Sequence, residues 1–271
     1  MKSFIRNKLP IKILKYFSFI RNYQHNVYSI NNPINLKNNI SDFFIWSNKC
    51  KHIEFLAENT RALMLGKEIN VTHNFKFFNE NGQVIYHQKH HTKNFFERIR
   101  LNLINFDFSY CSFIHYVDSD LSISEIIKKK NLEIKNNFCE QNRGYTIYYS
   151  SNDNSGSVVH GNFGGLTKNG QKMALTNTKK HLYTPIYKFK KDSNYDLVFN
   201  NPTNKIIDIF LWMDNFTHKK KLTIPPLGTR FFHLKNYFGS ISFESKLPIC
   251  RALLFVNPES NSIGNFDVFH T

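Results

Sequence analysis

Histidine has the widest chemical repertoire of the residues in this sequence, and the chain contains 12 of them. His87, His90 and His91 follow an Asn81-Gly82 pair, which is typical of a two-residue hairpin turn. Such a turn would place His73 of the preceding strand opposite His90. Neutral imidazoles on one sheet face can bind zinc or iron, so His73 and His90 form an alternative metal site. The simpler interpretation is a solvated basic hairpin, and no cofactor is expected.

A second pair of histidines lies near the ends of two similar segments, 158–163 and 265–270, which are rich in Phe, Val, His and Asn. His160 and His270 occupy matching places, and Asp267 is close enough in sequence to orient one imidazole. These three residues define an alternative in which the protein is a His-based enzyme, with or without a metal. The chain has no Gly-x-Ser-x-Gly motif. The favoured interpretation is therefore a non-catalytic protein, and it assigns no catalytic residue.

Aromatic and amide side chains suit a different chemistry, the recognition of a glycan or of another protein. The chain contains 27 Phe, 13 Tyr and 2 Trp residues. Aromatic rings stack on sugar faces, and Asn side chains hydrogen-bond to hydroxyl groups. Most of the Phe residues must fill the core, so the ligand-binding candidates form a small set. They are Trp46, Arg61, Tyr145 and Trp212.

Short strands must position all of these side chains. After Ser41 the sequence breaks into strand-like runs separated by Asn, Gly and Pro. Residues 122–138 match a helical period best and predict a helical insertion near residues 122–140. The predicted fold is mainly β, with two tandem β-sandwich domains, a short N-terminal helical arm and the one helical insertion. The predicted strands cover residues 53–57 (a strand or a short helix), 71–78, 84–86, 95–103, 110–117, 145–149, 157–160, 195–199 and 206–212.

An internal repeat supports the division into two units. In order along the chain, the turn at 200–204 parallels the Asn81-Gly82 turn, and residues 222–232 parallel 95–103. Residues 239–249 then parallel 111–123, and 254–262 parallel 148–155. The expected organisation is a basic amphipathic arm at 1–41, a first β-sandwich unit at 42–165, a linker and first strand region at 166–193, and a second unit at 194–271.

The formal charge of +16 comes from 36 Lys and Arg against 20 Asp and Glu. Excess Asn and Lys with few Ala and Arg is typical of AT-biased codons, so part of this charge is compositional. Lysine runs at 128–130, 188–191 and 219–221 define a third alternative, lysine-mediated binding of nucleic acid. Base readers rely mainly on Arg, and this chain has 28 Lys but only 8 Arg. Nucleic acid is therefore disfavoured.

The first 41 residues carry seven positive charges and no acidic residue. Pro10 can open a helix, and the apolar residues that follow share one broad face. Such an amphipathic helix either docks on the fold or contacts an anionic membrane through residues 1–24. The four cysteines form no C-x-x-C pair, which favours a reducing compartment. The expected location is the cytoplasm, peripheral to the inner face of the membrane.

Two resemblances add to these expectations. Residues 194–268, with the Asn-Pro turn, Pro225-Pro226-Leu227-Gly228 and the strand from Ser245 to Ala252, resemble the β-sandwich modules of sensory rhodopsin transducer proteins. That resemblance implies a module that binds a partner or small ligand and forms a homo-oligomer. Through residues 58–63 and the ending at 266–271, the chain resembles uncharacterised bacterial proteins of surface-polysaccharide gene neighbourhoods. The favoured function is therefore recognition of a glycan or protein partner in surface-polysaccharide production.

Overall fold

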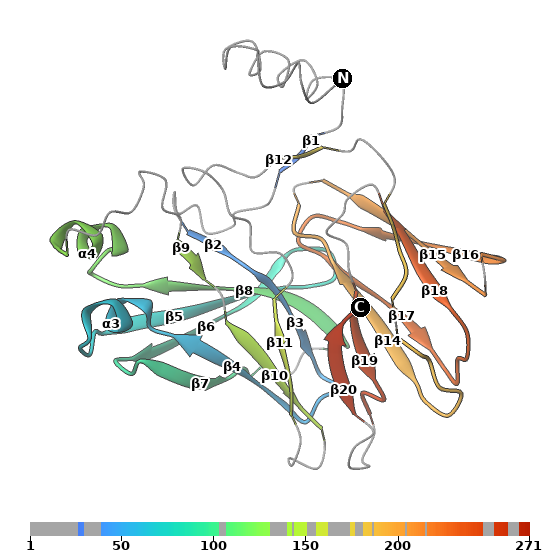
Figure 1. Cartoon of the computed structure of the whole chain (residues 1–271), viewed down its shortest axis with the longest axis horizontal. Helices are drawn as coiled ribbons and strands as arrows, with labels where there is room; N and C mark the ends of the chain where they lie inside the picture. The colour runs from blue at the N-terminus through green and yellow to red at the C-terminus, as the bar shows by residue number, and fades with distance from the viewer. Residues whose placement is uncertain are drawn as a thin grey trace, which may run out of the picture.

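The computed structural model describes residues 27–29, 39–102, 107–130, 140–142, 144–150, 156–161, 174–176, 181–185, 187–203, 205–214, 216–245, 252–259 and 266–271. Within these residues the protein is mainly β, which confirms that part of the predicted fold. Sixteen strands form four antiparallel sheets, and two short helices accompany them (Figure 1). Most of the predicted arm at 1–41 lies outside the described residues, as does much of the predicted linker; the described parts of the arm, Val27–Ser29 and Asn39–Ser41, are strands.

The strands of the first half form two sheets. Sheet I has the order β3 (Phe43–Ser47), β8 (Tyr110–Asp118), β5 (Val71–Phe78) and β6 (Val84–Thr92). Sheet II has the order β11 (Gly156–His160), β10 (Tyr145–Tyr149), β4 (His52–Glu58) and β7 (Phe96–Arg100). Two further pairs are small: β1 (Val27–Ser29) with β12 (Ala174–Thr176), and β2 (Asn39–Ser41) with β9 (Glu140–Asn142).

The second half repeats this strand order. Sheet III has the order β13 (His181–Tyr183), β18 (Ile241–Ser245), β15 (Ile207–Met213) and β16 (His218–Ile224). Sheet IV has the order β17 (Thr229–Leu234), β14 (Tyr195–Asn200), β19 (Leu253–Val256) and β20 (Asp267–His270). Taken in chain order, β13 to β20 occupy the same places in sheets III and IV as β3 to β8, β10 and β11 occupy in sheets I and II.

The predicted alignment of the two halves is correct only in its later part. Within the described residues, Ile241–Ser245 of the segment 239–249 and residues 254–256 of the segment 254–262 lie on β18 and β19, the strands equivalent to β8 and β10. The turn at 200–204, however, joins β14 to β15, whereas the Asn81-Gly82 turn joins β5 to β6. The true counterpart of the Asn81-Gly82 turn is the turn between β15 and β16. Both turns follow a hydrophobic strand, so composition alone does not separate them.

The two helices belong to the first half. In α3 (Thr60–Leu65) the Asn59 side chain caps the N-terminus by accepting a hydrogen bond from Ala62. Helix α4 (Ile123–Lys129) begins with a capping box between Ser122 and Glu125, and it lies inside the predicted insertion near 122–140. No helix among the described residues is long and apolar enough to cross a lipid bilayer.

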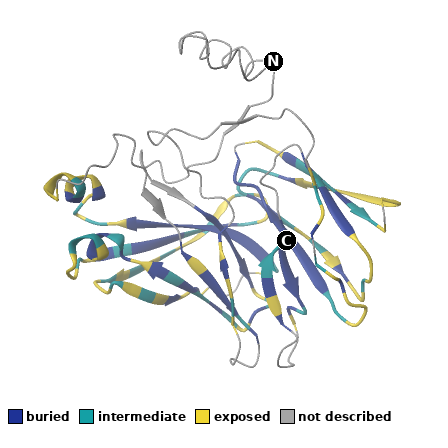
Figure 2. Cartoon of the chain, in the orientation of Figure 1, coloured by how far each residue is buried: buried dark blue, intermediate teal, exposed yellow. Residues whose placement is uncertain are grey.

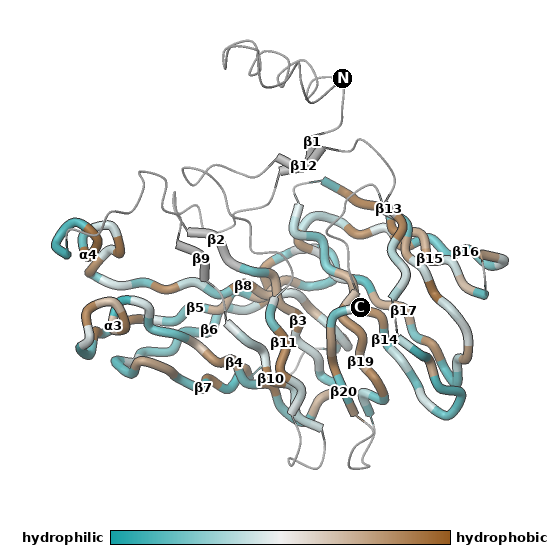
Figure 3. The backbone as a smooth tube through the Cα atoms, viewed as in Figure 1, coloured by the Kyte–Doolittle hydropathy of each residue, from teal (hydrophilic) through white to brown (hydrophobic). Residues whose placement is uncertain are grey.

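Sheet IV buries both of its faces. On β14, Leu197 packs into the core between sheets III and IV, whereas Val198 packs into the core formed with sheets I and II. On β19, Leu254 packs into the core between sheets III and IV, and Phe255 packs into the core formed with sheets I and II. Successive side chains of a strand point to opposite faces, so a strand that is apolar at every position must be covered on both sides. Figure 2 colours this region as buried, and Figure 3 shows β19 as hydrophobic.

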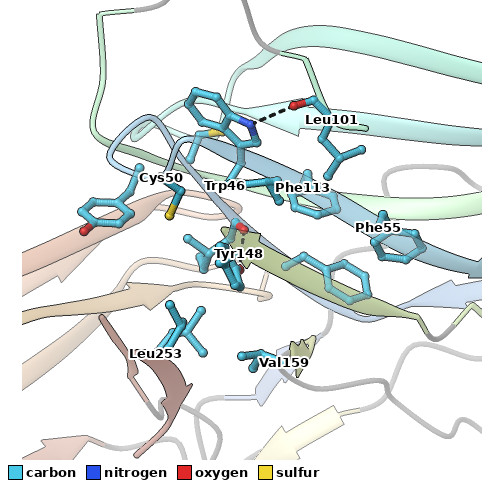
Figure 4. Close-up of a cluster of buried hydrophobic side chains, with 14 of the residues drawn as sticks. Trp46, Cys50, Phe55, Leu101, Phe113, Tyr148, Val159 and Leu253 are labelled. Atoms are coloured by element: carbon cyan, nitrogen blue, oxygen red, sulfur yellow. Dashed lines mark hydrogen bonds between the residues drawn. The ribbon is translucent and has the colours of Figure 1, made fainter. Parts of the chain in front are cut away.

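The core of the first half therefore includes side chains from the second. Trp46, Phe55, Phe113 and Tyr148 pack in one cluster with Leu253 of β19 (Figure 4). The Tyr148 hydroxyl is buried but donates a hydrogen bond to the Ile45 carbonyl at 2.6 Å. Such shared packing fixes the position of one half relative to the other.

A second junction joins β8 and the β5–β6 turn of the first half to the turn between β16 and β17 of the second half. The Ser112 hydroxyl donates to the Leu227 carbonyl at 2.6 Å, and the Thr229 amide donates to the Glu80 carbonyl at 3.3 Å. Gly82, with φ of 80°, lies directly against Pro226. A methyl group at Gly82 would overlap the Pro226 carbonyl oxygen.

Replacing Gly82 with alanine should lower the free energy of unfolding by about 3 kcal/mol, because a positive φ and a backbone overlap are both unfavourable for alanine. Gly66 is the matched control, since it has φ of 66° but nothing within 4 Å of an added Cβ. Gly66→Ala should therefore lose only about 1 kcal/mol. Urea denaturation measures both variants, and equal losses would contradict the close contact at Pro226.

Candidate functional site

A polar pocket of about 410 Å³ opens where the two halves meet. Lys49, from the turn between β3 and β4, is its contribution from the first half. The other lining residues belong to the second half and are Asp192, Asn194, His233, Asn257, Pro258 and Glu259. We call this hollow the Asp196 pocket, after the buried carboxylate that holds two of its lining side chains in place.

Asp196 is fully buried on β14 and accepts hydrogen bonds from three side chains. Lys49 Nζ lies 2.9 Å from Oδ2, and the Tyr110 hydroxyl lies 2.5 Å from the same oxygen. His233 Nδ1 lies 2.6 Å from Oδ1. Two of the three partners come from the first half and the third from the neighbouring strand β17. A buried carboxylate needs such partners, because transferring it from water without them is very unfavourable.

The charge of Asp196 affects the acidity of its neighbours. Burial raises the pKa of the Tyr110 hydroxyl well above its ordinary value, and the charge of Asp196 adds to this effect. For Lys49 burial lowers the pKa, but hydrogen bonds and charges from Asp196 and Glu259 outweigh it and leave the pKa raised. Lys49 is therefore a cation and Tyr110 a neutral donor near neutral pH. Lys49 Nζ also lies 3.1 Å from the Glu259 carboxylate.

Aromatic rings form the apolar side of the site. The Phe231 ring lies 5.1 Å from the Tyr110 ring, and Lys49 Nζ lies 5.7 Å from the Phe231 centroid. Phe231 is 41% exposed and lies two residues before His233 on β17, so both side chains project from the same face of sheet IV. An exposed ring therefore stands beside the polar pocket.

The rim of the pocket is held by paired asparagines. The Asn194 amide nitrogen donates to Asn257 Oδ1 at 2.7 Å, and the Asn257 amide nitrogen donates to the Asn194 carbonyl at 2.7 Å. Asn257 adopts a φ of 45°, a conformation that asparagine tolerates better than most residues. The first bond places the Asn257 side chain, and the Asn194 side chain accepts from the Asn236 backbone amide at 3.3 Å.

The chemistry open to this pocket is hydrogen bonding and proton transfer. Because Nδ1 of His233 is bonded to Asp196, Nε2 is the ring nitrogen left for a ligand. No Ser, Thr or Cys side chain is among the described residues that line the pocket. The described residues also contain no group of three His, Cys, Asp or Glu side chains placed to hold a metal ion.

Comparison with protein-family models, curated proteins and solved structures finds no match for this chain.

A larger hollow of about 530 Å³ lies at one end of sheet I. Its lining includes Thr72, His91 and Asp118. Thr72 Oγ1 lies 2.8 Å from His91 Nδ1, and Asn74 donates to Asp118 at 2.9 Å. The charged and titratable residues that line this hollow, among them His91 and Asp118, are all exposed, and none of them is a buried charge. The Asp196 pocket is therefore the better candidate, since its central charge is buried and held.

Two of the predicted ligand-binding residues are structural. Trp46 is 7% exposed and packs in the first core, where its indole nitrogen donates to the Leu101 carbonyl at 3.4 Å (Figure 4). Arg61 is 5% exposed on α3, and its Nε donates to the Leu121 carbonyl at 2.7 Å. Arg61 therefore ties α3 to the segment that precedes α4. Burial leaves neither side chain a surface that a ligand can reach.

The other two predicted residues are accessible but far apart in the fold. Tyr145 is 49% exposed at the start of β10 in sheet II, opposite His160. Trp212 is half-buried on β15 in sheet III, and its indole nitrogen donates to Glu244 at 3.3 Å. The four candidates lie on four different elements, and none of them lines the Asp196 pocket.

The predicted register of His73 and His90 is correct, but the closest partner of His73 is another histidine. His73 Nδ1 lies 2.9 Å from His115 Nε2, and both side chains are buried. His90 Nε2 instead lies 4.0 Å from Glu97. Burial lowers the pKa of His73 to about 4 and that of His115 well below its ordinary value. These imidazoles are neutral core groups.

The structure brings His160 and His270 together. Their ring centroids lie 4.4 Å apart, and His270 Nε2 donates to the His160 carbonyl at 2.8 Å. His160 Nδ1 donates to the Gly161 carbonyl at 2.8 Å. Asp267 accepts from the Ser157 hydroxyl at 2.8 Å rather than orienting either imidazole. The hydrogen bonds that link these residues join β20 to β11, the edges of sheets IV and II.

The sequence reasoning missed Lys49, Tyr110, Asp196 and His233. One signal was available, because Asp196 interrupts a run that is otherwise apolar from Tyr195 to Phe199. A charged residue inside a fully buried strand must have partners. Two of those partners, Lys49 and Tyr110, lie 147 and 86 residues away along the chain, so no local sequence pattern could identify them.

Proposed function

We propose that this chain is a non-catalytic binding protein that recognises a saccharide in the Asp196 pocket. The observation that carries the proposal is a buried carboxylate that holds two of the pocket's hydrogen-bonding side chains, beside an exposed aromatic ring. Sugars present both hydroxyl groups and apolar faces, so they suit a site with fixed polar groups and an aromatic platform. His233, Asn194 and Glu259 would bind the hydroxyl groups, and Phe231 would contact the apolar face.

The balance of charge favours a neutral ligand. The pocket contains the cation Lys49 and the titratable His233, against the carboxylates of Asp192, Asp196 and Glu259. Lys49 already pairs with two of these acids. An acidic sugar would meet three carboxylates against one lysine, whereas neutral hydroxyl groups can donate to carboxylates and accept from Lys49.

A glycan array probed with the purified full chain, followed by calorimetric titration of the strongest ligand, tests the proposal. His233→Ala and Glu259→Gln should each weaken binding by about tenfold, because each removes one fixed hydrogen bond. Thr223→Ala is the matched control, since Thr223 is exposed on β16 and bonds only to Asp208. Undiminished binding by both pocket variants would contradict the proposal and would favour recognition of a protein partner elsewhere.

The proposal also covers the domain arrangement of the chain and the place of the protein in the cell. Each half is taken as one β-sandwich unit in tandem, which the repeated strand order supports. The protein is placed in the cytoplasm, peripheral to the inner membrane face, where it would serve surface-polysaccharide production. The unpaired, buried thiols of Cys50 and Cys111 support a reducing compartment. The link to polysaccharide production rests on the sequence resemblance.

The geometry at His233 favours one second candidate, a His-based enzyme. A buried Asp that holds Nδ1 of a histidine fixes its tautomer and leaves Nε2 as a general base. Incubating the full chain with the ligand from the array, and analysing the products by mass spectrometry, separates the two candidates. Conversion that is lost in His233→Gln would establish the enzyme, whereas an unchanged ligand agrees with pure binding.

A further inference from the structure

Two loops at one end of the second half each present an exposed phenylalanine. Phe216, between β15 and β16, is 51% exposed. Phe238, between β17 and β18, is 68% exposed, the highest value among the large hydrophobic side chains that the structure describes. Exposing a phenylalanine to water is unfavourable, so two of them on neighbouring loops indicate a surface that is covered in use.

The two loops are joined to each other. The Tyr237 hydroxyl donates to Asp214 Oδ1 at 3.0 Å, and the Asp214 amide donates to the Ser240 carbonyl at 3.2 Å. Asp214, Phe216 and Asn236 adopt positive φ values of 51°, 70° and 47°. This conformation is unfavourable for a bulky residue such as Phe216 and persists only where the surrounding structure holds it. These hydrogen bonds hold together the two loops that carry the exposed rings.

Three lysines lie near the two loops in sequence, and one acid, Asp214, lies in the loop of Phe216. Lys219 and Lys220 follow Phe216 on β16, and Lys235 precedes Phe238; all three residues are exposed. Lys219 Nζ lies 4.6 Å from the centroid of the Trp212 ring, which also contacts Phe216 at 5.9 Å. Among the described residues, no carboxylate lies within ion-pair distance of these three lysines.

We propose that this Phe216–Phe238 end docks on the surface of an anionic lipid bilayer. The two phenyl rings enter the boundary between headgroups and acyl chains, Trp212 lies at the level of the headgroups, and the lysines contact anionic lipids. Charge complementarity and the separate, projecting rings argue for this partner. A deformable lipid surface accepts two isolated apolar projections on loops flanked by exposed lysines, whereas a protein face would need matching hollows.

Co-sedimentation of the full chain with vesicles tests the proposal. The probes are vesicles of phosphatidylcholine alone and vesicles in which about a third of the lipid is phosphatidylserine. The native chain should pellet with the anionic vesicles, and the double variant Phe216→Ala/Phe238→Ala should partition about tenfold less. Lys219→Gln/Lys220→Gln should also bind less, and its binding should depend less on salt.

The matched control is Phe96→Ala/Val158→Ala, since Phe96 and Val158 are 59% and 58% exposed on β7 and β11, away from this end. The control should bind like the native chain, and circular dichroism confirms that both double variants fold. Full binding by Phe216→Ala/Phe238→Ala would overturn the proposal and would assign membrane contact to residues 1–24. Failure of the native chain to bind anionic vesicles would overturn it as well.

Discussion

Replacing Asp196 with asparagine should lower the free energy of unfolding by about 3–5 kcal/mol, one of the largest effects that a single substitution in this protein can have. The native carboxylate accepts hydrogen bonds from Lys49, Tyr110 and His233. Asparagine has one carbonyl oxygen for these three donors, and its amide group would face a donor. Lys49 would then lose its ion pair with the buried carboxylate and keep only its pair with the exposed Glu259.

Guanidinium denaturation of the variant and of the native chain measures this loss. Asp208→Asn is the control, because Asp208 is 41% exposed and pairs with Lys221 at 3.0 Å on the surface of sheet III. A surface pair contributes about 0–1 kcal/mol, so the control should unfold almost as the native chain does. A loss below about 1 kcal/mol in Asp196→Asn would contradict a buried charge at the junction of the two halves.

Lowering the pH from about 7 to about 5 should destabilise the protein by about 4 kcal/mol through His73 and His115 alone. Burial, together with the charges of His90 and Arg61 and against that of Glu97, depresses the pKa of His73 to about 4. Burial and the charge of His73 depress the pKa of His115. Each unfolded imidazole binds its proton from about pH 6.5 downward, whereas the folded one does not. Stability is therefore complete above pH 6.5 and falls as the pH drops toward 4.

The double variant His73→Asn/His115→Gln tests this origin of the pH dependence. The two amides place polar atoms where Nδ1 of His73 and Nε2 of His115 meet at 2.9 Å, and neither amide titrates. Urea denaturation across this pH range should show a much flatter stability profile for the variant. His91→Gln, at an exposed position, should keep the native profile. An unchanged slope in the double variant would contradict neutral, buried imidazoles.

The strands were predictable because alternation and turn residues are local signals. Residues 71–78 and 145–149 coincide with β5 and β10, and Asn81-Gly82 lies in the turn that follows β5. The relation between His160 and His270 was also predictable, since the repeat assigns them equivalent strand ends. That these ends lie side by side depends on how sheets II and IV meet, which no repeat within one chain determines.

The candidate site was much less predictable, for physical reasons. Trp46 and Arg61 were singled out by residue type, yet type does not separate a buried tryptophan from a sugar platform. Nor does it distinguish an arginine that binds a backbone carbonyl from one that binds a ligand. The Asp196 pocket depends on packing between halves, because Lys49 and Tyr110 reach Asp196 only when sheet I covers sheet IV.

The burial of both faces of sheet IV explains why the pocket lies at this junction. Val198 and Phe255 cover one face of the sheet with apolar groups, and Asp196 adds a charge at the edge of the same face. In the core on the other face of sheet IV, the sheet III side chains Ile209, Leu211 and Phe243 are all apolar. Polar groups are thus concentrated where the halves meet, as expected for a binding site between units.

The most direct measurement of the central claim is NMR of the full chain labelled with ¹⁵N in its histidine side chains. On addition of the saccharide selected by the glycan array, the Nε2 signal of His233 should shift more than any other, because this nitrogen faces the ligand while Nδ1 stays bonded to Asp196. The signals of His73 and His115 should not move, since both are buried away from the pocket. A stationary His233 signal in the presence of a bound saccharide would contradict recognition in the Asp196 pocket.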